Sequence, residues 1–257
     1  MRKAGMLIIG RAFKLFVLNP FPLLSGLGMS LFFLIVYDAG LGGIGGLPEF
    51  EGAGYLAFLL PMGVVSLVFG SSAGSAQALS RDIASGYFKR LALAPTPRSA
   101  FVLAAILADA VGVFISSLAL IGIGFILGVP MRNGPAAAAI AALSAASLAT
   151  LFGGGVSAAS AAMVMRTGKV ELAGTVGTIV FMLLFLAPTF APRELMGAAW
   201  LRSVSVVNPL TYIMEAMRYL LSGTGDPRTV PIALSISCAF GLGGTLIAAR
   251  SVRNVLN

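Results

Sequence analysis

The chain has 257 residues, of which 58% are hydrophobic and only 10% are charged, and its mean hydropathy is +0.98. Soluble domains carry about 25% charged residues, and one core of this size cannot bury so much apolar surface. The composition therefore excludes a soluble globular protein and predicts an all-α membrane protein. With no histidine and a single cysteine, Cys238, the sequence also excludes histidine-based catalytic triads, histidine metal sites and an intrachain disulfide.

Apolar stretches long enough to cross a membrane recur six times along the chain. Roughly 20 apolar residues are needed for a helix to cross about 30 Å of hydrocarbon. The six predicted transmembrane helices cover residues 23–37, 55–77, 99–128, 136–165, 171–190 and 230–249. We therefore expect one transmembrane domain over residues 1–257.

The distribution of lysine and arginine predicts the orientation of these helices. Most of the 17 basic residues fall in the N-terminal segment, in the second and fourth breaks between spans, and in the C-terminal tail. Because cytoplasmic loops are rich in lysine and arginine, both termini are expected on the cytoplasmic side. The net charge of +8 is thus a signal of topology, and no nucleic-acid partner is predicted.

Residues 1–18 have the pattern of a helix that lies in the inner headgroup layer. Apolar positions such as Ile9 and Phe13 share one side, while Arg11 and Lys14 fall on another. Such an interfacial helix is either a membrane anchor or a lever that also contacts a cytoplasmic partner.

Residues 79–98 form the most densely charged cytoplasmic break. Aromatic side chains flanked by charges are typical of docking surfaces, because aromatic residues and arginine dominate binding energy. The alternative is a solvated loop. The residues that would contact a partner are Arg81, Asp82, Gly86, Tyr87, Phe88, Lys89 and Arg90.

The predicted outer segment, residues 191–228, contains a second helix. Asn208 is a good N-cap and Pro209 suits the first helical position, so a helix of about 14 residues is expected, too short to span. A polar stripe lies opposite the apolar face, and Glu215 and Arg218 are spaced to pair with each other. The segment is therefore either re-entrant or interfacial, and it acts either as an outer gate or as a cap. Its interfacial anchors would be Trp200, Tyr212 and Tyr219.

Two further features lie within predicted spans. Gly70 and Gly74 continue a four-residue repeat of small residues, which predicts close helix packing. The same glycines match a nucleophile-elbow motif, but the strand and the histidine that this motif needs are missing.

Asp109 is the one ionisable residue inside a predicted span. It would face either the bundle interior or the inner headgroups beside a basic loop residue. A second intramembrane acid is not predicted, which argues against a proton-driven carrier.

Together these residues resemble the permease subunits of ABC-2 type ATP-binding-cassette exporters, in the daunorubicin-type multidrug branch. The resemblance rests on three segments: the basic helix ending in Asn19-Pro20, the loop with Asp82 and Gly86, and the run from Asn208 to Arg218. Asp82 departs from the family pattern, where glutamate is more usual.

The resemblance implies a six-helix half-transporter in a bacterial or archaeal cytoplasmic membrane. It would pair with a second permease copy or a homologue, contact membrane lipid, and take its energy from a separate ATPase subunit that binds ATP and Mg. The chain itself would hold no cofactor and would not be an enzyme. Residues 80–91 would form the coupling helix, and the outer helices, residues 193–222, would close the exit.

The apolar interior favours a hydrophobic or amphipathic small molecule or a lipid as the exported substrate. Several alternatives stay open at this stage: a lipid-linked glycan as substrate, a proton-coupled secondary carrier, an intramembrane enzyme and a scaffold that transports nothing.

Overall fold

The computed structural model describes residues 21–84, 99–131 and 133–251. In these ranges the chain forms α-helices and short 3-10 helices and contains no strand, which confirms the all-α prediction. The α-helices are α2 (Phe21–Leu41), α3 (Tyr55–Ala84), α5 (Ser99–Ile126), α6 (Gly134–Thr167), α7 (Ala173–Phe185), α8 (Ala199–Val207), α9 (Pro209–Ser222) and α10 (Thr229–Ser251). The 3-10 helices are η1 (Gly42–Gly46), η2 (Pro48–Phe50), η3 (Val170–Leu172) and η4 (Arg193–Leu195).

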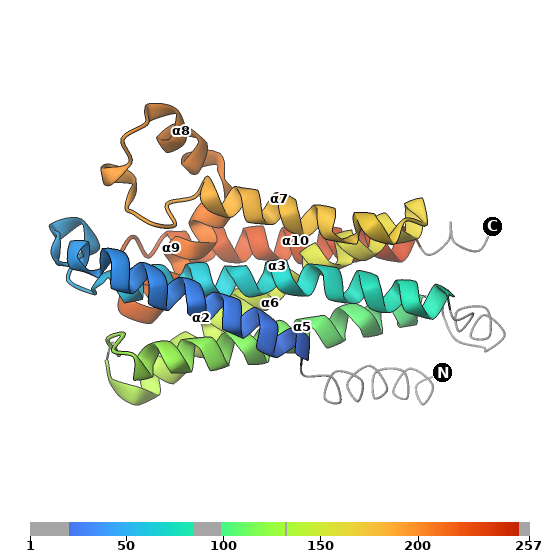
Figure 1. The fold of residues 1–257 in the computed structure, drawn as a ribbon, viewed down its shortest axis with the longest axis horizontal. Coiled ribbons are helices and arrows are strands. Elements are labelled where there is room, and N and C mark those ends of the chain that lie inside the picture. Colours follow the sequence, from blue (N-terminus) through green and yellow to red (C-terminus); the bar gives the residue numbers. More distant parts are fainter. Residues whose placement is uncertain (1–20, 85–98, 132, 252–257) are drawn as a thin grey trace.

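The long helices run side by side along the long axis of the molecule (Figure 1). One end carries η1, η2, α8 and the start of α9, and we call it the outer end, following the predicted orientation. At the opposite end lie the last turn of α3, the first turn of α5 and the ends of α6 and α10. The segments predicted to be outside the cell thus lie together, away from the helix ends that flank the predicted cytoplasmic breaks.

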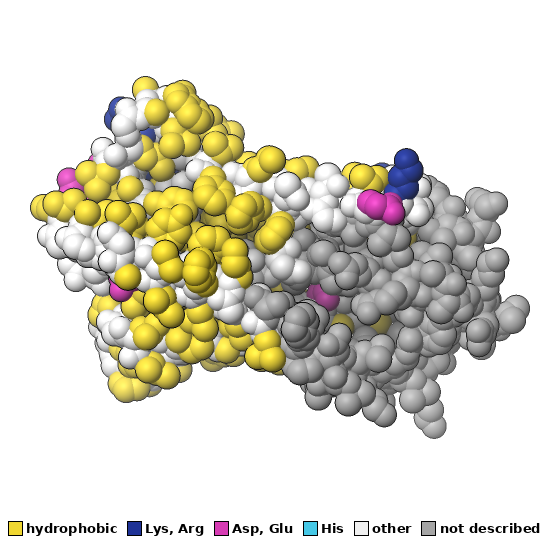
Figure 2. All heavy atoms as spheres, viewed as in Figure 1, with side chains coloured by type: hydrophobic (Ala, Val, Ile, Leu, Met, Phe, Trp, Pro, Cys, Tyr) yellow, Lys and Arg dark blue, Asp and Glu magenta, His cyan; other side chains and the backbone are white. Residues whose placement is uncertain are grey.

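Four of the helical stretches described are long and apolar enough to cross a membrane: Gly26–Gly46, Leu103–Ile126, Gly134–Thr167 and Thr229–Ser251. They correspond to the first, third, fourth and sixth predicted spans. The stretches Tyr55–Gly70 of α3 and Gly174–Phe185 of α7 are shorter apolar helices. On the face shown in Figure 2, hydrophobic side chains cover much of the described surface of the bundle, as a lipid-facing surface requires.

The largest differences between predicted and observed helix ends are in the fifth and second spans. The fifth predicted span ends at residue 190, but α7 has 13 residues, about 20 Å of helix, and ends at Phe185. Pro188 explains this end, because the residue before a proline is disfavoured in helical conformation. In contrast, α3 continues past residue 77 to Ala84, since no proline interrupts this part of the sequence. Residues 79–84 of the predicted break are therefore helical.

Helix α6 packs against α10, α3 and α5, while α3 also packs against α2, α7 and α9. The α6 and α10 backbones approach each other at glycines: a Cβ on Gly155 would lie 2.7 Å from the Gly241 nitrogen, and one on Gly244 would lie 2.9 Å from the Gly155 Cα. Next to this crossing the rings of Phe152 and Phe240 lie 5.1 Å apart between centroids. Only glycine permits this distance between the two helices.

The predicted packing face of the second span is not where this approach occurs. A Cβ on Gly70 would meet no atom within 4 Å, and Gly70 is exposed in the described part of the chain. The side-chain surroundings of Gly74 lie outside the described residues. The small-residue repeat identifies a helix face without bulky side chains. It does not specify which other helix packs against that face.

Candidate functional site

The outer end of the bundle is organised around the start of α9. The Oδ1 atom of Asn208 accepts a hydrogen bond of 3.0 Å from the backbone N–H of Leu210, and Pro209 occupies the first helical position. This confirms the predicted N-cap. The same side chain uses Nδ2 to donate to the backbone carbonyl of Leu183, at 2.6 Å. Asn208 therefore both starts α9 and fastens it to the last turns of α7.

We expect Asn208→Ala to destabilise the protein by about 1–2 kcal/mol, because it removes both the helix cap and the hydrogen bond from Nδ2 to the Leu183 carbonyl. Asn208→Asp should cost less, since the carboxylate still accepts from Leu210. Thermal unfolding in detergent measures the effect. Ser203→Ala is the matched control, because this exposed hydroxyl bonds only the Ala199 carbonyl in its own helix; equal losses in the two alanine variants would contradict the role given to Asn208.

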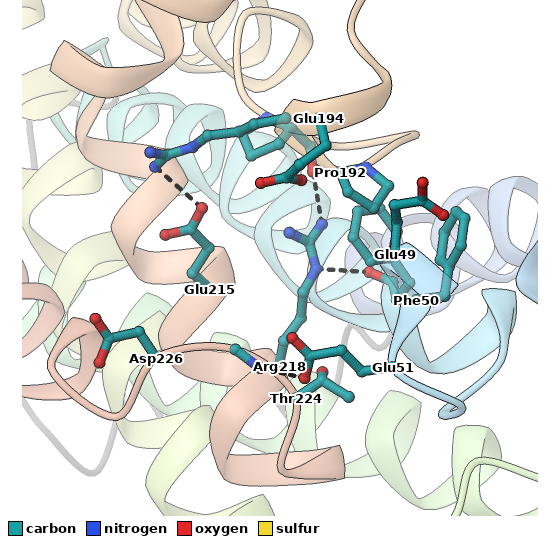
Figure 3. A pocket seen from close by; sticks show the side chains of 13 residues that line it. Glu49, Phe50, Glu51, Pro192, Glu194, Glu215, Arg218, Thr224 and Asp226 are labelled. Atoms are coloured by element: carbon teal, nitrogen blue, oxygen red, sulfur yellow. Dashed lines mark hydrogen bonds and ion pairs between the residues drawn. The ribbon is translucent and has the colours of Figure 1, made fainter. Parts of the chain in front are cut away.

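Arg218, on α9, is the most highly connected buried charge of the outer end. Its side chain is 5% exposed, and its guanidinium donates to two backbone carbonyls, from Nε to Phe58 at 3.0 Å and from Nη2 to Pro188 at 2.7 Å. The guanidinium carbon lies 3.6 Å from the centroid of the Phe58 ring, a cation–π contact. Figure 3 shows the Arg218 side chain extending from α9, with dashed lines that mark its hydrogen bonds. Arg218 thereby joins α9 to the first turn of α3 and to the loop after α7.

Glu215 forms its ion pair with a residue that the spacing did not suggest. The predicted partner was Arg218, but the Glu215 Oε1 atom lies 3.0 Å from Nη2 of Arg193, in η4 (Figure 3). The guanidinium carbon of Arg193 is also 6.0 Å from the centroid of the Tyr212 ring. Three-residue spacing places two side chains on one helix face, but contacts across the fold decide which of them pair.

The polar stripe predicted on α9 is largely shielded by protein. Thr211 and Arg218 are buried, and Glu215 and Ser222 are half-buried. The reason is that α9 packs against α10, α6 and α3, so the helix has contacts around most of its circumference. Tyr212 is half-buried as well, and its hydroxyl donates to the Val206 carbonyl at 2.7 Å, which links α9 to α8.

Burial also shifts the ionisation of these groups. It raises the pKa of the Glu215 carboxyl, and the Arg193 and Arg218 guanidiniums act in the opposite direction. Burial lowers the pKa of Arg218 to about 9, against the opposing effect of Glu215. Arg218 thus keeps its positive charge at neutral pH. Because its partners are uncharged carbonyls and an aromatic face, its charge is stabilised by dipoles more than by a counter-ion.

A cavity of about 240 Å³, with charged and apolar residues in its wall, lies between these residues and the 3-10 helix η2. Five carboxylates and two guanidiniums contribute to its wall, and the Glu51 Oε2 atom accepts a hydrogen bond of 2.9 Å from the Gly225 N–H. In the described ranges no three or more His, Cys, Asp or Glu side chains are grouped so as to hold a metal ion. The lining residues are Glu49, Phe50, Glu51, Phe58, Pro188, Pro192, Arg193, Glu194, Glu215, Arg218, Thr224, Gly225 and Asp226.

The other predicted site residues lie away from this end or outside the described residues. Asp109 is half-buried on α5 and has an interaction partner, and the choice between its two predicted surroundings stays open. Arg81 and Asp82 lie near the end of α3, where only the helical backbone is described. The remaining predicted residues lie outside the described ranges: Arg11, Lys14, Gly86, Tyr87, Phe88, Lys89 and Arg90.

Sequence reasoning missed Arg193 and the two carbonyl acceptors of Arg218. A backbone carbonyl gives no residue-type signal, so Phe58 and Pro188 could not have been identified this way. Arg193 offered a weak signal, since it is one of the few basic residues in the predicted outer segments.

Comparison with known proteins identifies the family of this chain. The sequence model of the ABC-2 type transporter family matches residues 4–222, which includes the described helices from α2 to α9. The chain is also 26% identical, over 245 residues, to the daunorubicin resistance ABC transporter permease protein DrrB1 of Streptomyces coeruleorubidus, covering 95% of this chain and 84% of that protein. The chain therefore belongs to the ABC-2 type transporter family and is an ABC transporter permease.

Proposed function

We propose that the chain is the permease subunit of an exporter that moves a hydrophobic or amphipathic small molecule, or a lipid, outward across the cytoplasmic membrane. A separate ATPase subunit would bind ATP and Mg and would drive alternating access. The observation that carries this proposal is the family match over residues 4–222, which includes the predicted coupling segment. The drug-resistance permease that resembles the chain supports the substrate class.

In this proposal the functional unit has six spans per chain and two permease chains. Helices α3 and α7 supply the second and fifth spans, in addition to the four longer apolar stretches. Both termini lie in the cytoplasm of a bacterium or archaeon, as the lysine and arginine distribution favours. A second copy or a homologue completes the pathway, and lipid covers the remaining apolar surface.

Helix α3 offers a direct mechanical link between the two ends of the permease. Phe58, whose carbonyl receives Arg218, lies in the first turn of α3, and Arg81 lies near its end, about 35 Å away along the helix axis. A displacement of the coupling segment by the ATPase would be carried along α3, which is one continuous helix from Tyr55 to Ala84. Arg218 would then transmit that movement to α9, which acts as the outer gate.

The proposal is tested by disrupting the coupling segment while keeping the membrane fold. Two variants are made: the double variant Arg81→Glu, Asp82→Lys and the single variant Gly86→Pro. We expect each of them to reduce the ATPase rate of the purified complex to that of the ATPase subunit alone. ATP-driven uptake of a fluorescent amphipathic dye into inverted vesicles, which corresponds to export from the cell, should be lost as well. Both readouts are compared at equal amounts of membrane-inserted permease.

Arg228→Glu serves as the control, because Arg228 is exposed at the outer end. It reverses a charge without touching the predicted coupling segment, so ATPase rate and export should match those of the wild type. Normal export by both the double variant and Gly86→Pro would contradict the assignment of residues 79–98 to ATPase coupling.

A further inference from the structure

Helices α6 and α10 end together at the end of the bundle opposite the outer end, which we call the inner end (Figure 1). Helix α6 ends at Thr167 and α10 at Ser251, and both are long and apolar enough to cross a membrane. The two ends are joined, because the Nε atom of Arg166 donates a hydrogen bond of 2.9 Å to the Ser251 hydroxyl. Both spans therefore leave the apolar layer at the same level, where the lipid headgroups begin.

This hydrogen bond fixes the orientation of the Arg166 guanidinium. Ser251 is 1% exposed, and its hydroxyl donates in turn to the Ile247 carbonyl of α10 at 2.7 Å. Arg166 itself is exposed, and its two Nη atoms have no hydrogen-bond or ion-pair partner among the described residues. A guanidinium anchored through Nε presents these two nitrogens as a fork that matches two oxygens of a phosphate.

Two more cations lie close to this fork. The left-handed backbone of Gly168, at φ 67°, ends α6 directly before Lys169, and Arg250 lies in the last turn of α10. Lys169 and Arg250 are both exposed, and Glu171 forms no ion pair with either of them in the described part of the chain. Figure 2 shows basic side chains beside an acidic one at this end. The helix dipoles favour cations in a last turn, but Lys169 lies beyond its helix, and a dipole requires no oriented fork.

An apolar stripe leads from these cations along α10 into the membrane. Leu242, Leu246 and Arg250 are spaced four residues apart, so they lie on one face of the helix. The two leucines are 68% and 57% exposed. Basic side chains at the headgroup level, continued by exposed leucines within the apolar layer, suit both the phosphate and an acyl chain of a phospholipid.

We propose that the inner end holds an anionic phospholipid of the cytoplasmic leaflet, such as phosphatidylglycerol. The Arg166 fork binds its phosphate, and the exposed leucines of α10 contact an acyl chain. Lys169 and Arg250 favour a headgroup that carries no positive charge of its own. This lipid is a bound component of the permease and not its cargo, so the proposal goes beyond the exporter function. It requires only the predicted orientation of the chain in the membrane.

Lipid added to the purified full chain in detergent tests the proposal. We expect phosphatidylglycerol to raise the melting temperature by about 3 °C relative to phosphatidylcholine with the same acyl chains, because a ligand that binds only the folded chain stabilises it. Glycerol 3-phosphate has the phosphate without the acyl chains and should cause no shift. Equal melting temperatures in the two lipids would overturn the proposal. An equal shift with glycerol 3-phosphate would also overturn it, because the site would then take a soluble phosphate.

The double variant Arg166→Gln, Arg250→Gln should lose this shift. Its matched control is Arg202→Gln, Arg228→Gln, which removes two exposed cations at the outer end and should keep the shift. Arg166→Lys preserves the charge but not the fork, so about half of the shift should remain. An undiminished shift in the inner double variant would contradict the site. If that variant instead lost the co-purifying ATPase, the surface would be a protein-docking site.

Discussion

Replacing Arg218 by methionine is expected to lower the melting temperature of the protein by about 5 °C or more and to abolish ATP-driven export. The guanidinium donates to the partly buried carbonyl of Phe58 and the buried carbonyl of Pro188, and methionine can donate to neither. A hydrogen bond made by a charged group contributes about 1.5–3 kcal/mol to stability. Because the three elements joined by Arg218 meet only at the outer end, the loss should be confined there and should uncouple α9 from α3.

Arg218→Lys separates charge from geometry. A lysine keeps the positive charge but lacks the planar fork that reaches both carbonyls, so we expect an intermediate melting temperature and little export. Arg228→Met removes an exposed arginine near the same end and should leave both measurements unchanged. Wild-type stability and export in Arg218→Met would show that α9 is held in place by other contacts.

Gly155→Ala is expected to cause the second large effect, a loss of about 1–3 kcal/mol through overpacking of the α6–α10 contact. The new Cβ would meet the backbone of α10 at Phe240 and Gly241, and backbone cannot rotate away as a side chain can. The two helices must therefore move apart at this contact. Gly244→Ala should behave alike, because its Cβ would meet the backbone of Gly155.

The chain supplies a matched control beside each of these glycines. A Cβ on Gly154 or on Gly243 would meet nothing within 4 Å, so alanine at either position changes helix propensity but not packing. We expect Gly154→Ala and Gly243→Ala to melt at or above the wild-type temperature. Equal melting temperatures for Gly154→Ala and Gly155→Ala, measured in the same detergent, would contradict the close contact between α6 and α10.

Local signals in the sequence predicted the start of α9 and the extents of α6 and α10. An asparagine followed by proline fixes a helix N-terminus through bonds within four residues, and hydropathy over some twenty residues marks a span. Helix α10 thus begins and ends within two residues of the predicted span. Pro188 also carried the local signal for the early end of α7, but the continuous apolar run of residues 171–190 obscured it.

Contacts between distant segments could not be predicted from one sequence. The partner of Glu215 is 22 positions away along the chain, and many folds would place another residue there. The same holds for the glycine contact, since Gly155 and Gly244 lie on different helices and become adjacent only when α6 and α10 pack. The burial of Arg218 is the clearest case, because its acceptors are backbone carbonyls that no side-chain pattern reveals.

The central claim is that this permease moves its substrate with energy from a separate ATPase. It is tested most directly in proteoliposomes that contain either the purified chain alone or the chain together with the ATPase subunit that co-purifies with it. ATP is supplied on the side of the membrane that exposes the ATPase, and a fluorescent amphipathic dye is the transported probe. We predict uptake against a gradient only when the ATPase and ATP are both present. Uphill uptake, or ATP hydrolysis, by the chain alone would contradict the claim.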